Sequence, residues 1–280
     1  MLKGKCRITI IRTINVRYRT EDEIAPDDAF DADSFDKPVI GIASEMGVHD
    51  SGRHSHLRHQ LLYSAAGSIT IELEQALCLL PPRRAVWIPA GTVHRAIMRG
   101  VMAYRSLYFS TTLPLSDLPL QIVDVNPLFF EVIERMSFWS WEMPAAQQTS
   151  LITVFCEEMR AAHSENWTLQ YPSDPRLNVW LEGLRMGELP PRLNQLSRQV
   201  GACERTIGRI FIRDTGMNYQ DWRQQFRLLK AMEMLADGCH ISQVAQYLEF
   251  VSDSAFIAFF HQHTGTTPGR YSGNIMPQKD

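Results

Sequence analysis

The C-terminal third of the chain contains an internal repeat, which restricts the fold more than any other feature of the sequence. In the first half of each unit the offset is 48 residues, which places Leu193, Leu196 and Val200 over Ile241, Val244 and Leu248. In the second half the offset is 49 residues, which places Ile207, Ile210, Phe211 and Gly216 over Phe256, Phe259, Phe260 and Gly265. Both offsets are explained by a supersecondary unit that occurs twice, with one extra residue in the turn of the second copy.

Each repeated unit has the pattern of two short helices joined by a turn. Apolar side chains recur three or four residues apart, the spacing that buries one face of a helix. Both units end in Thr-Gly, where the glycine is expected to cap the helix in the left-handed conformation. We predict helix-turn-helix units over residues 193–214 and 241–264, joined by a spacer helix over Tyr219–Leu235 that holds the two second helices about 34 Å apart.

The outer faces of the two second helices differ in charge. In the first unit Arg205, Arg209 and Arg213 recur every four residues, and the aligned positions of the second unit are Ser254, Ala258 and Gln262. Arginine reads guanine through two hydrogen bonds or clamps phosphate, so this face predicts DNA contact. The alternative is a solvated face in which Glu204 and Asp214 pair with the arginines. The candidate DNA-binding residues are Glu204, Arg205, Thr206, Arg209, Arg213, Ser252, Ser254 and Ala255.

The turns of the two units also differ, because Gly201 in the first corresponds to Glu249 in the second. If this backbone position is left-handed, the side chain of Glu249 should cost on the order of 1 kcal/mol.

The net charge of −3 argues against a polyanionic partner only until it is divided along the chain. Residues 183–230 carry nine basic and four acidic side chains, whereas residues 231–280 carry two and five. The charge therefore favours DNA binding by the first unit and weaker contact by the second.

Before this helical region, the chain consists of short apolar segments separated by glycine and proline. The expected strands are Val39–Glu45, Leu57–Ala65, Ile69–Leu73, Leu77–Leu80, Ala85–Ile88, Val93–Met98 and Val101–Phe109. Many short strands at regular spacing are typical of a sandwich or barrel. His54, His56 and Gln60 share one parity, so they should face one side of an unbroken strand, and His94 on another strand is expected to complete a site. His59 has the opposite parity and is expected at the surface or at the edge of the core.

The remaining segments suggest four divisions of the chain. Residues 1–36 have separated basic and acidic blocks and are interpreted as a poorly ordered extension, followed by a β domain over residues 37–112. Residues 113–172 form a helical connector, with helices over Pro127–Trp141 and Ala145–His163 that either close the barrel or pair with a second copy of the chain. The helical domain with its two units occupies residues 173–280.

Composition places the protein in a reducing, aqueous compartment. Apolar residues make up 45% and charged residues 21% of the 280, as in a soluble globular protein. No apolar run approaches the roughly 18 residues of a membrane span. The five cysteines are scattered without metal-finger spacing. We therefore expect a cytoplasmic protein that does not bind membranes.

The helical domain resembles the DNA-binding domain of the AraC/XylS family of transcriptional regulators. The matching residues include Arg205-Thr206-Ile207, Thr215-Gly216-Met217, Trp222-Arg223, Val244-Ala245, Ser254-Ala255-Phe256 and Thr267-Pro268. The β domain resembles a jelly-roll cupin, since Gly47 through His54-Ser55-His56, then Gln60 and Gly67, and Pro89-Ala90-Gly91-Thr92-Val93-His94 match the two cupin motifs. The resemblance implies a multi-domain regulator that senses a small-molecule effector, binds promoter DNA and contacts RNA polymerase.

The same resemblance leaves the chemistry of the histidine site open. Metal-binding cupins use two histidines, an acid and a further histidine, and here Gln60 stands in the place of the acid. Either His54, His56, Gln60 and His94 bind an organic effector, or His54, His56 and His94 hold a divalent metal, or the residues are purely structural. An effector-responsive transcription factor that is not an enzyme is our leading hypothesis. A cupin metalloenzyme, such as a dioxygenase or isomerase, fused to a DNA-tethering module is the alternative, and an interaction protein with vestigial units is a third.

Overall fold

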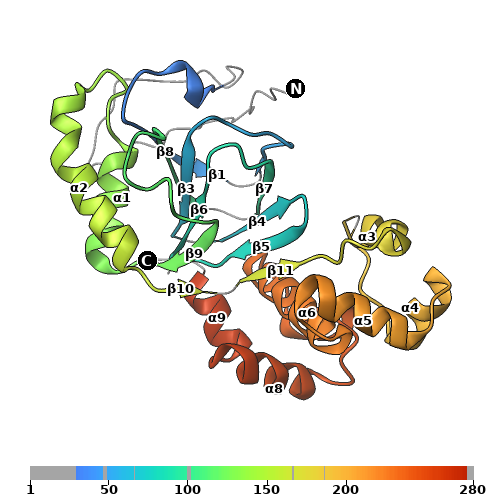
Figure 1. The fold of residues 1–280 in the computed structure, drawn as a ribbon. Coiled ribbons are helices and arrows are strands. Elements are labelled where there is room, and N and C mark those ends of the chain that lie inside the picture. Colours follow the sequence, from blue (N-terminus) through green and yellow to red (C-terminus); the bar gives the residue numbers. More distant parts are fainter. Residues whose placement is uncertain are drawn as a thin grey trace. The chain divides into compact units, whose positions relative to one another are not determined.

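The computed structural model describes residues 30–46, 49–65, 67–99, 102–165, 167–185 and 187–275. The chain divides into two compact units, one of residues 1–73 and 80–167 and the other of residues 74–79 and 168–280 (Figure 1). None of the described helices is long and apolar enough to cross a membrane.

The first unit is built around a six-stranded antiparallel sheet. Its strand order is β1 (Val39–Met46), β8 (Met102–Phe109), β3 (His59–Ser64), β6 (Arg84–Ile88), β9 (Gln121–Asp124) and β10 (Ser164–Glu165). In this register Gln60 lies opposite Tyr108 on one neighbouring strand and Ile88 on the other. Because strand side chains alternate between faces, Gln60 and Tyr108 point to the same face of the sheet.

A second set of antiparallel strands in this unit comprises β4 (Ser68–Leu73), β7 (His94–Arg99) and β2 (His49–Asp50). The side chains of Ile69 and Ile71 are fully buried. The next strand, β5 (Ala76–Leu80), belongs to the second unit except for Leu80, and it pairs there with β11 (Thr168–Gln170). Two antiparallel sheets followed by a helical region agree with the predicted cupin-like fold class.

Two helices cover the outer face of the six-stranded sheet, α1 (Pro127–Ser137) and α2 (Ala145–Ala161) (Figure 1). Their apolar side chains, including Phe129 and Phe155, form one core with Trp87, Leu107 and Phe109 of the sheet. Of the two roles expected for these helices, the structure shows the packing against the barrel. The segment that we predicted to be a helical connector also contributes β9 and β10 to the sheet.

An ion pair that the sequence did not suggest joins this sheet to α1. Arg105 on β8 and Glu134 on α1 are both almost fully buried and form two hydrogen bonds of 2.7 and 2.9 Å. Removal of either partner would leave a buried charge without compensation, so the pair fixes how α1 lies on the sheet.

Part of the expected N-terminal extension is packed on the barrel. Residues 1–29 lie outside the described residues, but Phe30 is buried and its ring contacts Tyr108 and Trp141 at centroid distances of 5.5 and 5.6 Å. The short 3₁₀ helix η1 (Ala32–Ser34) follows, and the carboxylate of Asp33 accepts hydrogen bonds from the amide of Leu57. The expectation of poor order was therefore wrong for residues 30–36, because charge-pattern reasoning did not include these tertiary contacts.

The second unit is helical and contains the two predicted helix-turn-helix units. After η2 (Pro175–Leu177) its helices are α3 (Asn178–Arg185), α4 (Leu193–Val200), α5 (Glu204–Thr215), α6 (Tyr219–Ala236), α7 (Ile241–Tyr247), α8 (Asp253–Thr264) and α9 (Pro268–Ile275). Helices α4 and α5 form the first helix-turn-helix unit, and α7 and α8 form the second helix-turn-helix unit. The spacer helix α6 lies between them in sequence and buries the side chains of Trp222 and Met232.

Candidate DNA-binding face and effector site

Matching hydrogen bonds build the two helix-turn-helix units. The amides of Arg192 and His240 each donate to a glutamine three residues later, both at 3.0 Å, at the start of α4 and α7. Gly216 and Gly265 cap α5 and α8 in the left-handed conformation, with φ of 71° and 69°. Both predicted caps are confirmed, and the repeat in sequence is a repeat in structure.

Gly201 and Glu249, which are aligned in the turns of the two helix-turn-helix units, both have a left-handed backbone, the condition stated above for strain at Glu249. Their φ angles are 65° and 58°. The carboxylate of Glu249 accepts a hydrogen bond of 2.9 Å from the guanidinium of Arg223, which is buried on α6. This contact offsets part of the strain that a side chain adds in the left-handed region.

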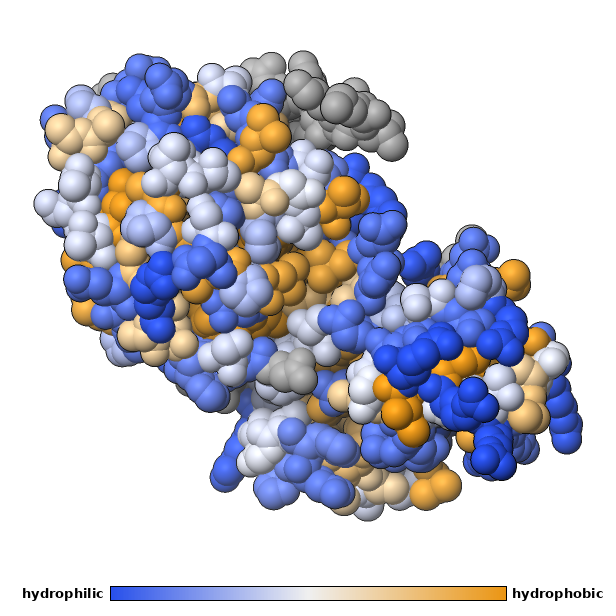
Figure 2. Space-filling view, in the orientation of Figure 1, coloured by the Kyte–Doolittle hydropathy of each residue, from blue (hydrophilic) through white to orange (hydrophobic). Residues whose placement is uncertain are grey.

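The outer face of α5 carries the predicted arginines. Arg205 and Arg209 are exposed, and neither makes a hydrogen bond or ion pair with another described residue. Glu204 is also exposed, Thr206 is half-buried beside Cys203, and Ile212 is 59% exposed. Strongly hydrophilic side chains gather over α4 and α5, with apolar ones between them (Figure 2). Such a face presents two guanidiniums for phosphate or base contact.

The third arginine of the predicted set is committed to local partners. Arg213 forms hydrogen bonds of 2.5 and 3.0 Å with Asp214 and a longer one, of 3.5 Å, with Asp174. The guanidinium holds the pKa of Asp214 below its usual range, and the same carboxylate accepts two hydrogen bonds from Ser173. The local pairing that we weighed for the whole face is therefore observed at Arg213, where it ties the segment before α3 to the end of α5.

The corresponding face of α8 offers few charges. Ser254, Ala258 and Gln262 are exposed, and Ala255 is half-buried. The hydroxyl of Ser252 accepts a hydrogen bond of 3.1 Å from the amide of Ala255, so this predicted DNA contact also acts as the N-cap of the helix.

Two basic residues that contributed to the charge count of the first unit face the protein interior. Arg223 donates to the carbonyl of Pro190 at 2.7 Å, and Arg227 donates to the carbonyl of Leu248 at 3.0 Å while stacking 3.9 Å above the ring of Phe250. Burial lowers the pKa of Arg227 to about 10. These guanidiniums join α6 to the turn of the second unit, so the count of nine basic residues overstates the charge available to DNA.

The histidine site lies in the β domain, where a short backbone bridge joins His54 to His94. His54 and His94 exchange backbone hydrogen bonds of 3.0 and 2.9 Å, which places their rings side by side at a centroid distance of 4.4 Å. The ring of His56 lies 5.3 Å from that of His94. All three side chains are buried, and one ring nitrogen of each lies within 4.8 Å of the others. The structure thus brings together the histidines that parity and sequence motif singled out.

The remaining hydrogen bonds specify the tautomer of each ring. The Nδ1 atoms of His54, His56 and His94 lie 3.0, 2.6 and 2.9 Å from backbone carbonyl oxygens. A carbonyl only accepts, so each Nδ1 carries a proton, and in the neutral form of each ring Nε2 offers a lone pair. Burial lowers the pKa of His94 to about 3, which keeps this ring neutral. The arrangement is that of three imidazoles whose ligand-capable nitrogens converge.

Gln60 completes this group from β3. Its Oε1 atom lies 3.1 Å from Nε2 of His56, and its amide nitrogen donates to the hydroxyls of Ser106 and Tyr108 at 3.0 and 2.9 Å. Sequence reasoning missed Ser106 and Tyr108, although their alternation along β8 matched the parity of the site.

His59 points away from these residues, as its parity predicted, but it is 4% exposed and stacks on Trp87 at a centroid distance of 5.2 Å. It therefore belongs to the core on the opposite face of the sheet. Of the two positions expected for His59, the surface and the edge of the core, the surface is excluded because the chain after β8 covers this face: Ser116 Oγ lies 3.2 Å from Nε2 of the ring.

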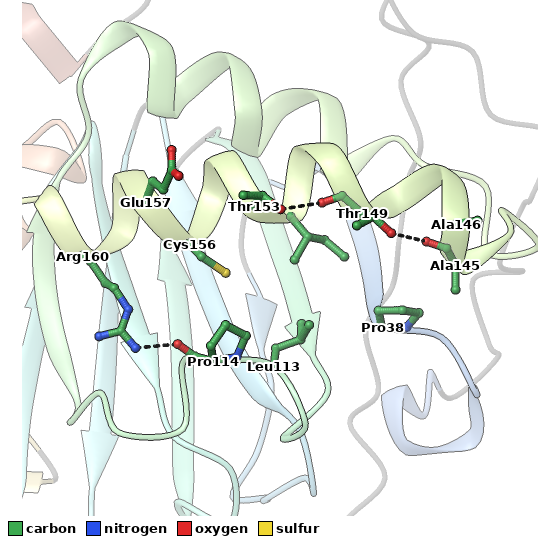
Figure 3. Close-up of a pocket in the computed structure, with 11 residues that line it drawn as sticks. Pro38, Leu113, Pro114, Ala145, Ala146, Thr149, Thr153, Cys156, Glu157 and Arg160 are labelled. Carbon is green, nitrogen blue, oxygen red and sulfur yellow. Dashed lines mark hydrogen bonds between the residues drawn. The ribbon is translucent and has the colours of Figure 1, made fainter.

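A separate pocket of about 550 Å³ lies between α2 and the segments that carry Pro38 and Leu113–Pro114 (Figure 3). It is lined by Pro38, Leu113, Pro114, Ala145, Ala146, Thr149, Ile152, Thr153, Cys156, Glu157 and Arg160. The two threonine hydroxyls donate to carbonyls of their own helix, and Arg160 is bound to Asp117 and to the carbonyl of Pro114. These polar groups are already paired, so they offer less for orienting a ligand than the histidine site does.

Two family models match the two parts of this chain. A model of the AraC-like ligand-binding domain matches residues 38–118, and a helix-turn-helix domain model matches residues 196–274. The transcriptional regulator NimR of Escherichia coli K12 is 29% identical over 256 residues, which cover 88% of this chain and 92% of NimR. The regulator RipA of Corynebacterium glutamicum is 32% identical over 80 residues, covering 29% of this chain and 24% of RipA. The solved structure of ToxT from Vibrio cholerae is 10% identical, with a TM-score of 0.36, and covers 86% of this chain and 100% of that one.

The fold and these matches define a class of protein, the two-domain regulators that join a ligand-binding barrel to a pair of helix-turn-helix units. Within that class, the chain belongs to the AraC family of transcription regulators, with an N-terminal ligand-binding domain and a C-terminal DNA-binding domain.

Proposed function

We propose that this regulator binds promoter DNA chiefly through α5 and that a small-molecule effector bound beside His54, His56, Gln60 and His94 controls this binding. The observation that carries the first part is the position of Arg205 and Arg209. Both are exposed on the second helix of a helix-turn-helix unit and lack partners among the described residues. Arginines in this position read bases in the major groove. The face of α8 contacts DNA more weakly because it presents small and uncharged side chains.

The test is the affinity of the full chain for an operator identified by genome-wide mapping of its binding sites. If each arginine contacts a base, Arg205→Ala and Arg209→Ala should each cost roughly 1 to 3 kcal/mol of binding free energy at that operator. Arg53→Ala is the matched control. It removes an exposed arginine from the β domain, outside the helix-turn-helix units, and should bind as the wild type does. Unchanged affinity in both α5 variants would exclude this assignment.

Phosphate contacts add a second, independent measurement. Binding that releases counterions must weaken steeply as the salt concentration rises. A flat salt dependence would favour an interaction protein with vestigial helix-turn-helix units over a DNA-binding regulator.

Three further parts of the proposal are supported by family membership rather than by a contact among the described residues. The protein acts in the cytoplasm, contacts RNA polymerase when bound at a promoter and forms a homodimer. Light scattering of the purified chain measures its mass in solution, and transcription in vitro with purified polymerase tests the second contact.

We also propose that the protein is a sensor and not an enzyme. The amide of Gln60, held by Ser106 and Tyr108, occupies the position where catalytic cupins carry an acid. A neutral amide cannot act as the general base or the anionic metal ligand that such an enzyme needs.

A further inference from the structure

The histidine site contains a buried nitrogen without a hydrogen-bond partner. Nε2 of His94 has no donor within reach among the described residues, although the side chain is 1% exposed. Since Nδ1 of the same ring donates to the carbonyl of Thr92, Nε2 is a bare acceptor. A buried acceptor left unpaired is unfavourable, so this nitrogen is expected to bind a ligand.

A second acceptor conflict lies beside it. Nε2 of His56 and Oε1 of Gln60 are 3.1 Å apart, and in the tautomer set by the carbonyl of Arg58 both atoms are acceptors. The hydroxyls of Ser106 and Tyr108 engage the amide nitrogen of Gln60. A flipped amide would donate to His56 but would still leave His94 unpaired. A cation between these atoms satisfies all of them at once.

The donor set selects the kind of cation. Imidazole nitrogens suit zinc, nickel, iron and copper, and three of them with an amide oxygen fill four positions without any thiolate. Each ring is already oriented by a carbonyl on its other nitrogen, which is the outer-sphere support that histidine ligands of metals have. The three nitrogens lie within 4.8 Å of one another. Small rotations of the rings would bring all three to bonding distance of one ion.

The positive charge of a metal ion bound at this site would determine which effector can bind. Three neutral imidazoles and an amide leave a divalent ion with its full charge in a buried position, and no hydrogen bond of these four side chains to a described residue involves a carboxylate. A buried, uncompensated charge is unfavourable until an opposite charge joins it.

We propose that His54, His56, His94 and Gln60 bind one divalent transition-metal ion and that the effector is an anionic oxygen ligand, such as a carboxylate, which completes the coordination of that ion. This inference rests on the proposed function, because it names the effector class of the same pocket. Gln60, where an acid would cancel one charge, is the residue that makes the site a receptor for anions.

The first experiment measures metal alone. The full chain, stripped with a chelator, is titrated with Co²⁺ and Zn²⁺ and followed by calorimetry and by the visible absorption of Co²⁺. We expect one ion per chain, and an affinity at least about a hundredfold lower in His54→Ala and His94→Ala. His163→Ala removes an exposed histidine outside the site and should bind as the wild type does. A folded wild type that takes up no stoichiometric ion overturns the proposal and indicates ordered water at these nitrogens instead.

The second experiment tests the anion. Acetate should shift the visible spectrum of the Co²⁺-loaded chain, whereas neutral acetamide at the same concentration should not. Gln60→Glu supplies its own carboxylate, so this variant should bind the metal about tenfold more tightly or better and respond less to acetate. A loaded wild type whose spectrum ignores acetate, or a Gln60→Glu variant with the wild-type response, contradicts the proposal.

Operator binding measured on the same samples separates the two levels of inference. If the wild type binds its operator but takes up no metal, this inference fails alone. If no variant and no metal state binds any operator, the proposed function fails.

Discussion

The two helix-turn-helix units of this regulator share a scaffold but differ in their surfaces. In both, a glutamine side chain caps the first helix, a left-handed residue makes the turn and a glycine ends the second helix. The hydroxyls of Thr215 and Thr264 even donate to equivalent carbonyls, those of Phe211 and Phe260, at 2.7 and 2.8 Å. Buried positions and helix ends are restricted by packing and backbone geometry, so they are alike in the two units although the outer faces differ.

The two helix-turn-helix units differ in which arginines are exposed and which are bound within the domain. The first exposes two arginines on α5, whereas the second exposes Ser254 and Ala258 on α8 and is tied to the spacer helix by Arg223 and Arg227. The first helix-turn-helix unit therefore exposes positive charge to solvent, whereas the turn of the second binds arginines of the spacer helix. From this contrast we infer that the first unit supplies most of the electrostatic attraction to DNA and the second mainly completes the fold.

The largest effect should come from the shared core. Phe211→Ala and Phe260→Ala each remove a fully buried ring from an equivalent position, so each should lower the free energy of unfolding by about 3 to 5 kcal/mol. Urea denaturation measures this loss, and Ile212→Ala, on the exposed side of α5, should change stability far less. A small loss in Phe260→Ala alone would mean that the second scaffold is not equivalent to the first.

The next prediction transfers the surface of one unit to the other. Ser254→Arg and Gln262→Arg together restore two arginines of the α5 pattern to α8, and each new phosphate contact should steepen the salt dependence of operator binding by a slope of about 1. Ser150→Arg adds the same charge to an exposed position of α2 and serves as the control. If the double variant and the control respond alike, then α8 does not approach DNA.

A smaller effect is expected at the two turns. Gly201→Ala should cost about 1 kcal/mol, entirely from the left-handed backbone, because no atom of the described residues, apart from its chain neighbours and its own helix, lies within 4 Å of the added Cβ. Glu249→Gly relieves the same strain but loses the bond to Arg223, so the two contributions should nearly cancel. Thermal unfolding of Glu249→Ala, which keeps a Cβ in the left-handed backbone and removes the acceptor of Arg223, isolates the second contribution. A Glu249→Gly variant no more stable than Glu249→Ala would show that the strain is negligible.

The smallest effect concerns Arg213 and acid. The pKa of Asp214 is lowered in the folded state, first of all by Arg213, so the folded carboxylate stays ionised where the unfolded one protonates. This stabilisation is present above the ordinary aspartate pKa of about 4 and is lost as the pH falls through the lower, folded value. Arg213→Ala should therefore reduce the loss of stability between neutral and acid pH, as measured by thermal unfolding across that range. An unaltered pH profile would show that Arg213 does not hold the carboxylate.

Local patterns in the sequence predicted much of this molecule. The repeat, both glycine caps and the grouping of the three histidines are confirmed, and the left-handed backbone on which the expected strain at Glu249 depended is observed. Each depends on periodicity or on a short motif, which adjacent residues carry. The packing of Phe30 on Trp141 and the burial of the Arg105 ion pair were not predictable in this way, since their partners lie far along the chain.

The sequence by itself determined that this protein has two helix-turn-helix units, a β domain before them and an arginine pattern on only one of the two second helices. Helix periodicity and backbone conformation are local properties, so residue types and spacing were enough. Only the tertiary structure decided which charges are available. Arg223 and Arg227 belong to the same basic segment as Arg205 and Arg209, yet they bind carbonyls 33 and 21 residues away. Whether a charged group faces solvent or the interior depends on such distant partners, and these come together only when the chain folds.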